Sequence, residues 1–248
     1  MKSYTPITHK KSRKTITPTM KKLAEEGELS RIGDWVLYKN NQLIAFNKPS
    51  GLPVQEDKDG EGKALINLAE IYTKSKLWLI HRLDQPASGV VLFAKTKSAL
   101  VSLNEQFRNR EVRKTYLAIV KNQPPEQEGT LIHYLWKNAK TNRSQAFSEE
   151  GPGRQKGELH YRVVARSEHY YLLEIQLISG RHHQIRAQLA AIDCPIKGDN
   201  KYGASRGNPD RSICLHAWKL DFKHPVSGEW VHLTAPLPED PLWNAFDY

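Results

Sequence analysis

The sequence predicts an α+β fold in which a mixed, largely antiparallel β-sheet is flanked by helices. Segments with the apolar patterns of strands outnumber segments with helical spacing, and the two kinds are mixed along the chain. Several strand segments also come in consecutive pairs that a short polar turn joins, which is typical of antiparallel hairpins. No shift in composition divides residues 31–248, so we expect them to form one domain.

The first half of the chain contains a predicted hairpin and two predicted helices. Residues 35–49, WVLYKNNQLIAFNKP, form two short apolar runs around Asn40 and Asn41. Residues 64–74 have helical spacing and place on one face Leu65, Leu68, Ile71 and Tyr72. A second helix is predicted for residues 98–109, with Ser98 as its N-cap. Its inward-facing residues are Leu100, Leu103 and Phe107.

In the second half, residues 115–120, TYLAIV, are a predicted strand. Two further strands, LHYRVVAR and YYLLEIQLI, are joined by a polar turn at residues 167–169. A third helix is predicted to begin at Arg181, directly after Gly180, and to end before Pro195. Its apolar positions are Ile185, Leu189 and Ile192.

The remaining segments complete this outline. CLHAWKLDF and EWVHLTAP form a predicted last hairpin, closed by KHPVSG with its proline and glycine. Residues 137–157 are polar and contain glycine, proline and arginine, so we expect a long surface loop there. Residues 1–30 are rich in lysine and poor in large apolar residues, which predicts a basic, flexible N-terminal arm.

The charge balance points to a polyanionic partner. Lysine and arginine total 37 against 27 acidic residues, which gives a net charge of +10 and a pI near 9.5. Nucleic acid is the partner that such an excess favours, although a basic charge can also serve only to keep a protein in solution.

Several kinds of location and assembly are not expected. No stretch approaches the roughly 18 to 20 apolar residues of a membrane span. The chain has two cysteines and no secretory signal, so we expect a cytoplasmic protein with reduced thiols and no membrane partner. Nothing is similar to a coiled-coil seam, so a monomer is expected.

Asp84 is the first residue with a chemical signature. In IHRLDQPASGVVLFAKT, Arg82 and Asp84 stand between two apolar runs, and buried charges are costly unless they are paired or used. A carboxylate there can be a nucleophile, a general base, a metal ligand or half of a structural ion pair. A metal is disfavoured, because the stretch offers only His81 and Asp84 as ligands. Local chemistry favours catalysis and a structural pair about equally.

The stretch ISGRHHQIRAQL is the second candidate. Gly180 permits a tight turn, and Arg181 could hold a carboxylate in a bidentate pair. His182 and His183 are adjacent, so on a helix they would point in different directions, which disfavours a metal site. Arg186 is interpreted as solvated or as a phosphate contact.

The stretch RKTYLAIV is the third candidate. A tyrosine in a strand is most often a packing residue, but beside a carboxylate in a basic groove Tyr116 could stack on a base. Lys114 lies on the same strand face and could contact a phosphate.

Together these stretches resemble the RluA-type RNA pseudouridine synthases. HRLDQPASGVVLFAKT is similar to the family's catalytic block, LIAFNKPSGLPVQ to the block before it, and KTYLAIV to the Lys-x-Tyr block after it. LISGRHHQIRAQLAAIDCPIKGDNKYG is similar to the arginine-containing block, and LHAWKLDFKHPVSGEWVHLTAP to the C-terminal hairpin. Five motifs in this order, over residues 34–238, make the resemblance highly specific. The departures, at Ala87, Ser179 and His182, spare the carboxylate and both arginines.

The resemblance implies the pseudouridine synthase catalytic fold for residues 31–248, and residues 1–30 are too few for the S4 RNA-binding domain that the family often carries. It implies isomerisation of a uridine in structured RNA, ribosomal or transfer, with no cofactor and no metal. Asp84 would be the nucleophile, Tyr116 would stack on the uracil, and Arg181 would pair with Asp84. Arg82 would insert where the flipped nucleotide had been. The other expected RNA contacts are His81, Lys114, Gln184 and Arg186.

Two alternatives remain open from the sequence. One is a non-catalytic RNA-binding protein that uses the same basic cleft, for which Asp84 would be dispensable. The other is a glycoside hydrolase, which would need a second carboxylate near Asp84.

Overall fold

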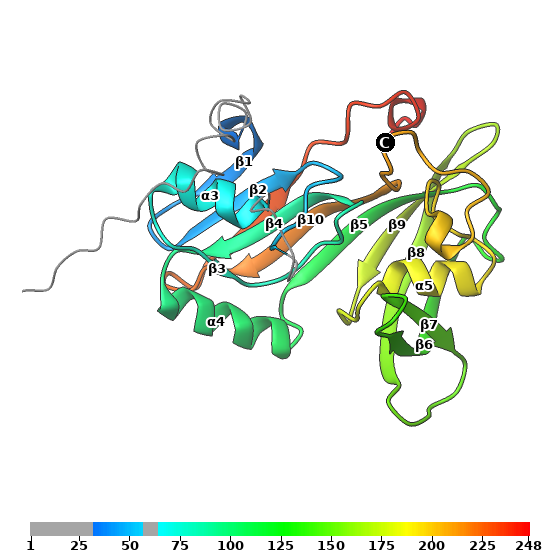
Figure 1. Ribbon diagram of the computed structural model, residues 1–248, viewed down its shortest axis with the longest axis horizontal. Coiled ribbons are helices and arrows are strands. Elements are labelled where there is room, and N and C mark those ends of the chain that lie inside the picture. Colours follow the sequence, from blue (N-terminus) through cyan, green and yellow to red (C-terminus); the bar gives the residue numbers. More distant parts are fainter. Residues whose placement is uncertain (1–31, 57–63) are drawn as a thin grey trace, which may run out of the picture.

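The computed structural model describes residues 32–56 and 64–248, so the predicted arm of residues 1–30 lies outside the described residues. Eleven strands form one mixed sheet, whose main path runs in the order β1-β2-β4-β10-β5-β9-β8-β6-β7 (Figure 1). β11 pairs with β10 and β3 pairs with β4 beside this path. Only the pairing of β10 with β4 is parallel among the described strands, which confirms the predicted fold class.

The strands and helices have the following bounds. The strands are β1 Val36–Lys39, β2 Leu43–Lys48, β3 Trp78–Leu79, β4 Ser88–Ala94, β5 Arg113–Val120, β6 Glu128–Asn138, β7 Arg143–Phe147, β8 Gln155–Arg166, β9 Tyr171–Leu177, β10 Leu215–Lys223 and β11 Trp230–Thr234. The α-helices of the described residues are α3 Leu65–Thr73, α4 Lys97–Arg108 and α5 Gln184–Ala191. Short 3₁₀ helices are η1 Ile32–Trp35, η2 Asn200–Tyr202 and η3 Trp243–Ala245.

In the first half of the sheet, β1 to β4, strands β2 and β4 are covered on both faces because they are apolar on both faces. Every residue of β4 is buried. Alternate residues Val91 and Phe93 share a core with Leu65 and Leu68 of α3. The residues between them pack with Ala99 and Leu103 of α4 on the opposite face. Figure 1 shows where α3 and α4 lie relative to these strands.

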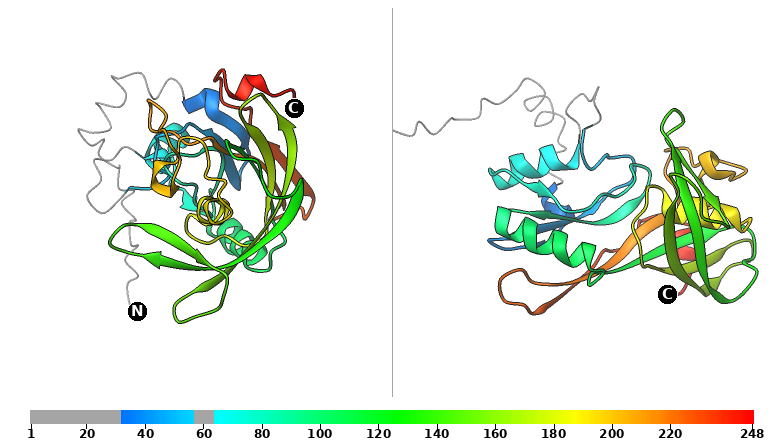
Figure 2. Two further views of the ribbon diagram at one scale, coloured as in Figure 1. Left: turned by 90° about the vertical axis from the view of Figure 1, so that its right-hand side faces the viewer. Right: turned by 90° about the horizontal axis from the view of Figure 1, so that it is seen from below.

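The second half of the sheet, β5 to β9, curves around α5 (Figure 2). Ile185 and Leu189 of α5 join the core formed by β5, β8 and β9. Ala187, on another side of the same helix, packs with Leu135 of β6 and with Tyr202. α5 is therefore fixed from two sides, and the turn that precedes it is held against the middle of the sheet.

Gly89 allows the two halves to meet closely. Its φ is +115°, and a Cβ there would lie 2.3 Å from the carbonyl oxygen of Ala217 on β10. Any side chain would separate β4 from β10, which would move the turn that carries Asp84.

Most predicted elements are confirmed, including both hairpins, the strands at residues 115–120, 159–166 and 170–178, and the helix at residues 64–74. Three expectations are wrong. The N-cap of α4 is Thr96, whose hydroxyl accepts the amide hydrogen of Ala99, and Ser98 lies inside the helix. The third helix begins at Gln184 rather than at Arg181.

The third wrong expectation is the loop at residues 137–157. This segment contains the end of β6, all of β7 and the start of β8, in a continuous antiparallel ladder. These strands have no apolar alternation in the sequence, because they are polar and only partly buried at this edge of the sheet. In the described part of the chain, no helix is both long and apolar enough to cross a membrane.

Candidate active site

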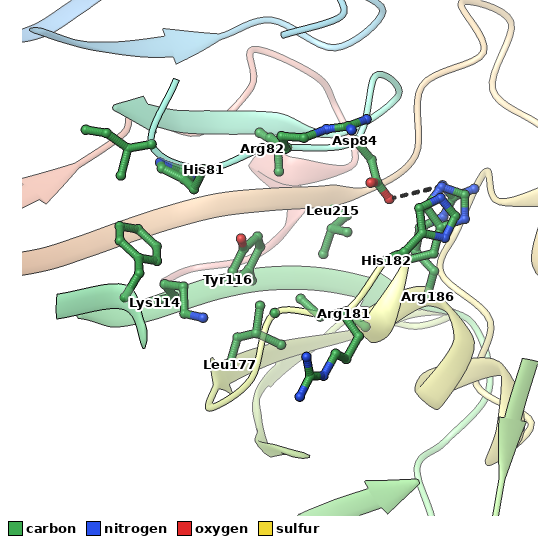
Figure 3. Close-up of a pocket in the computed structure, with 16 residues that line it drawn as sticks. His81, Arg82, Asp84, Lys114, Tyr116, Leu177, Arg181, His182, Arg186 and Leu215 are labelled. Carbon is green, nitrogen blue, oxygen red and sulfur yellow. Dashed lines mark hydrogen bonds and ion pairs between the residues drawn. The ribbon is translucent and has the colours of Figure 1, made fainter. Parts of the chain in front are cut away.

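A cavity of about 440 Å³ is lined by residues from both halves of the sheet, and we call it the Asp84 pocket. Its walls are the segment before β4, the end of α4, strand β5 and the turn that leads into α5 (Figure 3). All the predicted site residues except Gln184 line it, namely His81, Arg82, Asp84, Lys114, Tyr116, Arg181 and Arg186.

Asp84 stands at the start of a tight turn. Its carbonyl oxygen accepts the amide hydrogen of Ala87 at 3.1 Å, and the turn delivers the chain into β4. The carboxylate is 28% exposed, so a substrate can reach it. An ion pair with a buried side chain fixes its position.

Arg186 supplies that ion pair. Its Nη1 lies 3.1 Å from Oδ2 of Asp84, and its Nε and Nη2 make a bidentate pair with Asp199 at 2.7 and 2.9 Å. The side chains of Arg186 and Asp199 are only 5% and 1% exposed. The guanidinium is thus fixed from behind by Asp199 and presents its remaining edge to Asp84.

The prediction that Arg181 pairs with Asp84 is wrong. Arg181 is exposed, its side chain points away from Asp84 in Figure 3, and its Nε donates to the carbonyl oxygen of Lys156 at 3.1 Å. The interpretation of Arg186 as solvated or phosphate-bound is wrong as well. The conformation of His183 explains why Arg186, rather than Arg181, pairs with Asp84. Its φ of +50° delays the start of the helix to Gln184 and places Arg186 in the first turn, beside Asp84.

Lys48 is a second buried cation near Asp84, and its role was not predicted from the sequence. Its Nζ donates to the carbonyl oxygens of Pro49, Leu52 and Gln85 at 2.8, 2.8 and 3.2 Å. Burial lowers the pKa of Lys48 to about 7, and the negative charge of Asp84 opposes that shift. A lysine is seldom fully buried, so the useful signal was its place between an apolar strand and Pro49.

Tyr116 and Lys114 lie on the same face of β5, as predicted, and both line the Asp84 pocket. Burial raises the pKa of the Tyr116 phenol well above its usual value, and the charge of Asp84 adds to the rise. The phenol is therefore protonated at neutral pH. Burial also lowers the pKa of Lys114 to about 8, with Arg110 contributing.

His182 and His183 do not point in different directions. Their rings stack with centroids 3.8 Å apart, because both precede the helix rather than lie on it. Nδ1 of His183 lies 2.9 Å from the hydroxyl of Tyr202, and its Nε2 lies 3.8 Å from Asp84. Burial, followed by the charge of Arg186, lowers the pKa of His183 to about 2. Burial and the nearby Lys137 lower that of His182 to about 4. Both imidazoles are therefore neutral at physiological pH.

The other predicted RNA contacts differ in their availability. Arg82 is exposed at the rim of the pocket. Nε2 of His81 accepts the amide hydrogen of Leu92 at 3.1 Å, and its ring stacks on Phe107, so this nitrogen is not available to RNA. The structure contradicts an RNA contact for Gln184, which is 3% exposed and bonded internally. The oxygen of its side-chain amide accepts hydrogen bonds from the hydroxyl of Ser179 and the backbone amide of Arg181, and its nitrogen donates to the carbonyl oxygen of Glu158.

Asp84 is the only carboxylate among the described residues that line the pocket. The nearby Asp199 lies behind Arg186 and is 1% exposed. The pocket therefore lacks the second accessible carboxylate that a glycoside hydrolase requires. Among the described residues, no group of three or more histidine, cysteine and acidic side chains could hold a metal ion.

Comparison with known proteins gives a consistent result. Residues 42–191 match the family model described as RNA pseudouridylate synthase. A Bacillus subtilis (strain 168) protein named uncharacterized RNA pseudouridine synthase YhcT is 32% identical over 225 residues, which are 88% of this chain and 72% of the relative. Ribosomal large subunit pseudouridine synthase C of Yersinia pestis is 32% identical over 221 residues, 86% of this chain and 69% of that one.

Solved structures agree with this result. Human RNA pseudouridylate synthase domain containing 4 superposes with a TM-score of 0.72 at 26% identity, covering 88% of this chain and 94% of the human one. Human RNA pseudouridylate synthase domain containing 1 shares the fold, with a TM-score of 0.71 at 23% identity, over 85% of this chain and 86% of the other.

Proposed function

The chain belongs to the RluA-type family of RNA pseudouridine synthases, isomerases that act on RNA, and on this premise we propose that Asp84 is the nucleophile. The observation that carries the proposal is the arrangement of its carboxylate. It is the accessible acid of the pocket, and a buried arginine orients it through a contact of 3.1 Å. A fixed, charged and partly desolvated carboxylate is what covalent attack requires.

In the proposed reaction, the bond between N1 of uracil and C1′ of ribose breaks and a bond between C5 and C1′ forms. The base rotates in between while Asp84 holds one of the two fragments covalently, whether the attack is at C1′ or on the uracil ring. C5 loses a proton and N1 gains one, so the product is an isomer of the substrate. The pocket needs no cofactor for this balance.

The other pocket residues have supporting roles in the proposal. Tyr116 stacks on the uracil, a contact that its buried ring on β5 supports. Its raised pKa keeps the phenol protonated, so it removes the C5 proton only if it passes its own proton on. Arg82, exposed at the rim, occupies the space that the flipped nucleotide leaves. Lys114 contacts a phosphate or a base edge from β5.

We propose a uridine in an unpaired loop of structured RNA as the substrate. Flipping costs a few kcal/mol and least where the base is already open. Ribosomal and transfer RNA both provide such loops, and a relative named as a large-subunit ribosomal enzyme supports the first. In this proposal residues 31–248 are the catalytic domain, acting as a monomer.

The substitution Asp84→Asn tests the proposal. We expect pseudouridine formation at the target uridine to fall at least about a thousandfold, because the variant lacks the nucleophile. Folding and RNA binding should be retained, since the amide keeps the size of the side chain. Mapping of pseudouridines by chemical labelling and sequencing measures the effect and also identifies the RNA.

Asp221→Asn is the matched control. Asp221 is 22% exposed, similar to Asp84, and its Oδ1 lies 2.8 Å from Nδ1 of His232. This variant should modify RNA at the normal rate. Substantial pseudouridine formation by purified Asp84→Asn protein would end the proposal and favour a non-catalytic RNA-binding function.

A further inference from the structure

The groove at Asp84 continues beyond the carboxylate. Asp84 and Arg82 line the Asp84 pocket on one side and a second cavity, of about 270 Å³, on the other. Lys201 lines this second cavity and also a third one, of about 640 Å³, beside the hairpin of β6 and β7. We call the third one the hairpin cavity. The three cavities form a series with Asp84 at the first junction and Lys201 at the second.

The hairpin cavity has the size and lining of a nucleotide site. Its volume lies within the roughly 300–1,000 Å³ of small-molecule sites. One wall is apolar and consists of small residues of α5, Ala187 and Ala190 among them. The others carry two aromatic rings, Trp136 and Tyr202, and two cations, Arg143 and Lys201. None of the described residues that line it is acidic.

Contacts with neighbouring residues hold the two cations in place. Arg143 lies over the ring of Tyr202, 5.0 Å from its centroid. Nζ of Lys201 donates to the carbonyl oxygen of Asn142 at 2.9 Å, while the side chain stays exposed. Trp136, on β6, is 40% exposed although it is among the largest apolar side chains. An exposed indole beside two cations matches the way proteins bind single-stranded nucleic acid, with bases stacked on rings and phosphates on cations.

The hairpin cavity is close to the nucleophile. The hydroxyl of Tyr202 lies 2.9 Å from Nδ1 of His183, and Nε2 of His183 lies 3.8 Å from Asp84. Two side chains therefore separate the cavity from the carboxylate. A strand whose target base enters the Asp84 pocket would reach the hairpin cavity with a nucleotide next to the target.

We propose that the hairpin cavity binds an unpaired nucleotide that neighbours the target uridine. Trp136 stacks on its base, and Arg143 and Lys201 contact the phosphates on either side of it. The inference rests on the proposed function for its RNA substrate, and it adds that the target uridine lies in a single-stranded segment rather than beside a base-paired stem.

Equilibrium binding of a fluorescein-labelled decauridylate, measured by anisotropy, tests the proposal. Trp136→Ala should weaken binding by about five- to 140-fold, the range expected when one stacked base is lost. Trp136→Phe keeps a ring and should bind within twofold of wild type. The matched control is Trp230→Ala on β11, because Trp230 is 43% exposed and also lies beside two cations. Cζ of Arg113 and Nζ of Lys223 are 5.2 and 5.8 Å from the centroid of its ring. It should bind like wild type.

The cations are tested by the salt dependence of the same binding. Arg143→Gln with Lys201→Gln should reduce the slope of log affinity against log salt by about 1.4, since each phosphate contact to a single strand contributes about 0.7. Arg113→Gln with Lys223→Gln should leave the slope unchanged. Thermal unfolding of each variant verifies that the fold is retained.

Two results would overturn the proposal. One is binding by Trp136→Ala within twofold of wild type, and the other is an equal loss in Trp230→Ala, which would show that any exposed indole has this effect. Because the readout is binding, it does not depend on which residue is the nucleophile. Failure of the Asp84 assignment would instead appear as pseudouridine formation by Asp84→Asn, with the decauridylate result unchanged.

Discussion

Lys48 and Arg186 are two buried cations near Asp84, and they bind different parts of the molecule. Arg186 binds carboxylates, Asp84 on one edge and Asp199 on the other. Lys48 binds backbone, with all three hydrogens directed at carbonyl oxygens of the two loops that meet under Asp84. One cation therefore orients the side chain of Asp84, and the other joins the loops that support it.

The choice of residue follows from these partners. A planar guanidinium can make a bidentate pair with Asp199 and still offer an edge to Asp84. An ammonium has three hydrogens that fit three separate carbonyl oxygens, without a fixed plane. Two negative partners compensate the charge of Arg186, whereas Lys48 has only dipoles and the more distant Asp84. Burial accordingly lowers the pKa of Lys48 to about 7, while the pKa of Arg186 is raised by its hydrogen bonds to Asp199 in spite of burial.

Removal of Arg186 should have the largest effect on stability. Arg186→Met leaves Asp199, which is 1% exposed, without a partner, and breaking a buried ion pair in this way costs about 3–5 kcal/mol. Urea unfolding measures that loss. Pseudouridine formation should also fall about a hundredfold or more, because Asp84 is no longer oriented.

Arg181→Met is the control for this prediction. Arg181 is exposed, and its Nε is bonded to a single carbonyl oxygen. We expect a change within about 0.5 kcal/mol in the free energy of unfolding. An equal loss of stability in both variants would contradict the assignment of Arg186 as the central cation.

Lys48→Met should have a smaller effect on stability. The carbonyl oxygens of Pro49 and Leu52 lose the ammonium donor, and that of Gln85 keeps only the amide hydrogen of Gly51. The cost of burying a cation disappears as well, so we expect a net loss of about 1–3 kcal/mol. The turn at Asp84 loosens, so the rate of pseudouridine formation should fall while RNA affinity stays near that of wild type. Urea unfolding and single-turnover kinetics separate the two effects.

Lys95→Met is the matched control for Lys48→Met. Nζ of Lys95 donates to one backbone carbonyl, that of Asn40, at 2.6 Å, in a half-buried position. It should lose less stability than Lys48→Met and retain the full catalytic rate. If Lys48→Met formed pseudouridine at the rate of wild type, the lysine would stabilise the fold without influencing Asp84.

The sequence predicted most strands of the sheet and most residues of the pocket. It did not predict which arginine pairs with Asp84. Apolar strands such as β4 have an unmistakable pattern because they are buried on both faces, whereas β7 is short, polar and at an edge. The identity of the arginine beside Asp84 depended on where α5 begins, and that depends on the left-handed conformation of His183. A histidine gives no pattern signal for such a conformation, in contrast to a glycine.

Lys48 and Asp199 were beyond pattern analysis for another reason. Both are charged residues whose burial depends in part on a partner from another element, Gln85 for the lysine, beside its neighbours Pro49 and Leu52, and Arg186 for the aspartate. Only the fold brings these partners together. Both residues nevertheless lie inside the stretches that resemble the family's motifs, which was the available signal.

The smallest expected effect concerns His183, which would be a third cation beside Asp84 if it were protonated. Burial and Arg186 lower its pKa to about 2, so the unfolded chain takes up a proton below about pH 6.5 that the folded site refuses. The free energy of unfolding therefore falls as the pH drops below 6.5. In His183→Gln this part of the fall is absent, and we expect the difference in stability between pH 7.5 and pH 5 to shrink by about 1 kcal/mol.

Urea unfolding at the two pH values checks this prediction, with His160→Gln as the control, since 41% of the side chain of His160 is exposed. The glutamine can keep a hydrogen bond to Tyr202, and His183 carries no charge at neutral pH, so pseudouridine formation at pH 7.5 should stay within about tenfold of wild type. A much larger loss of activity that follows a titration near pH 6.5 would make His183 a working cation of the site. The orientation of Asp84 would then depend on His183 as well as on Arg186 and Lys48.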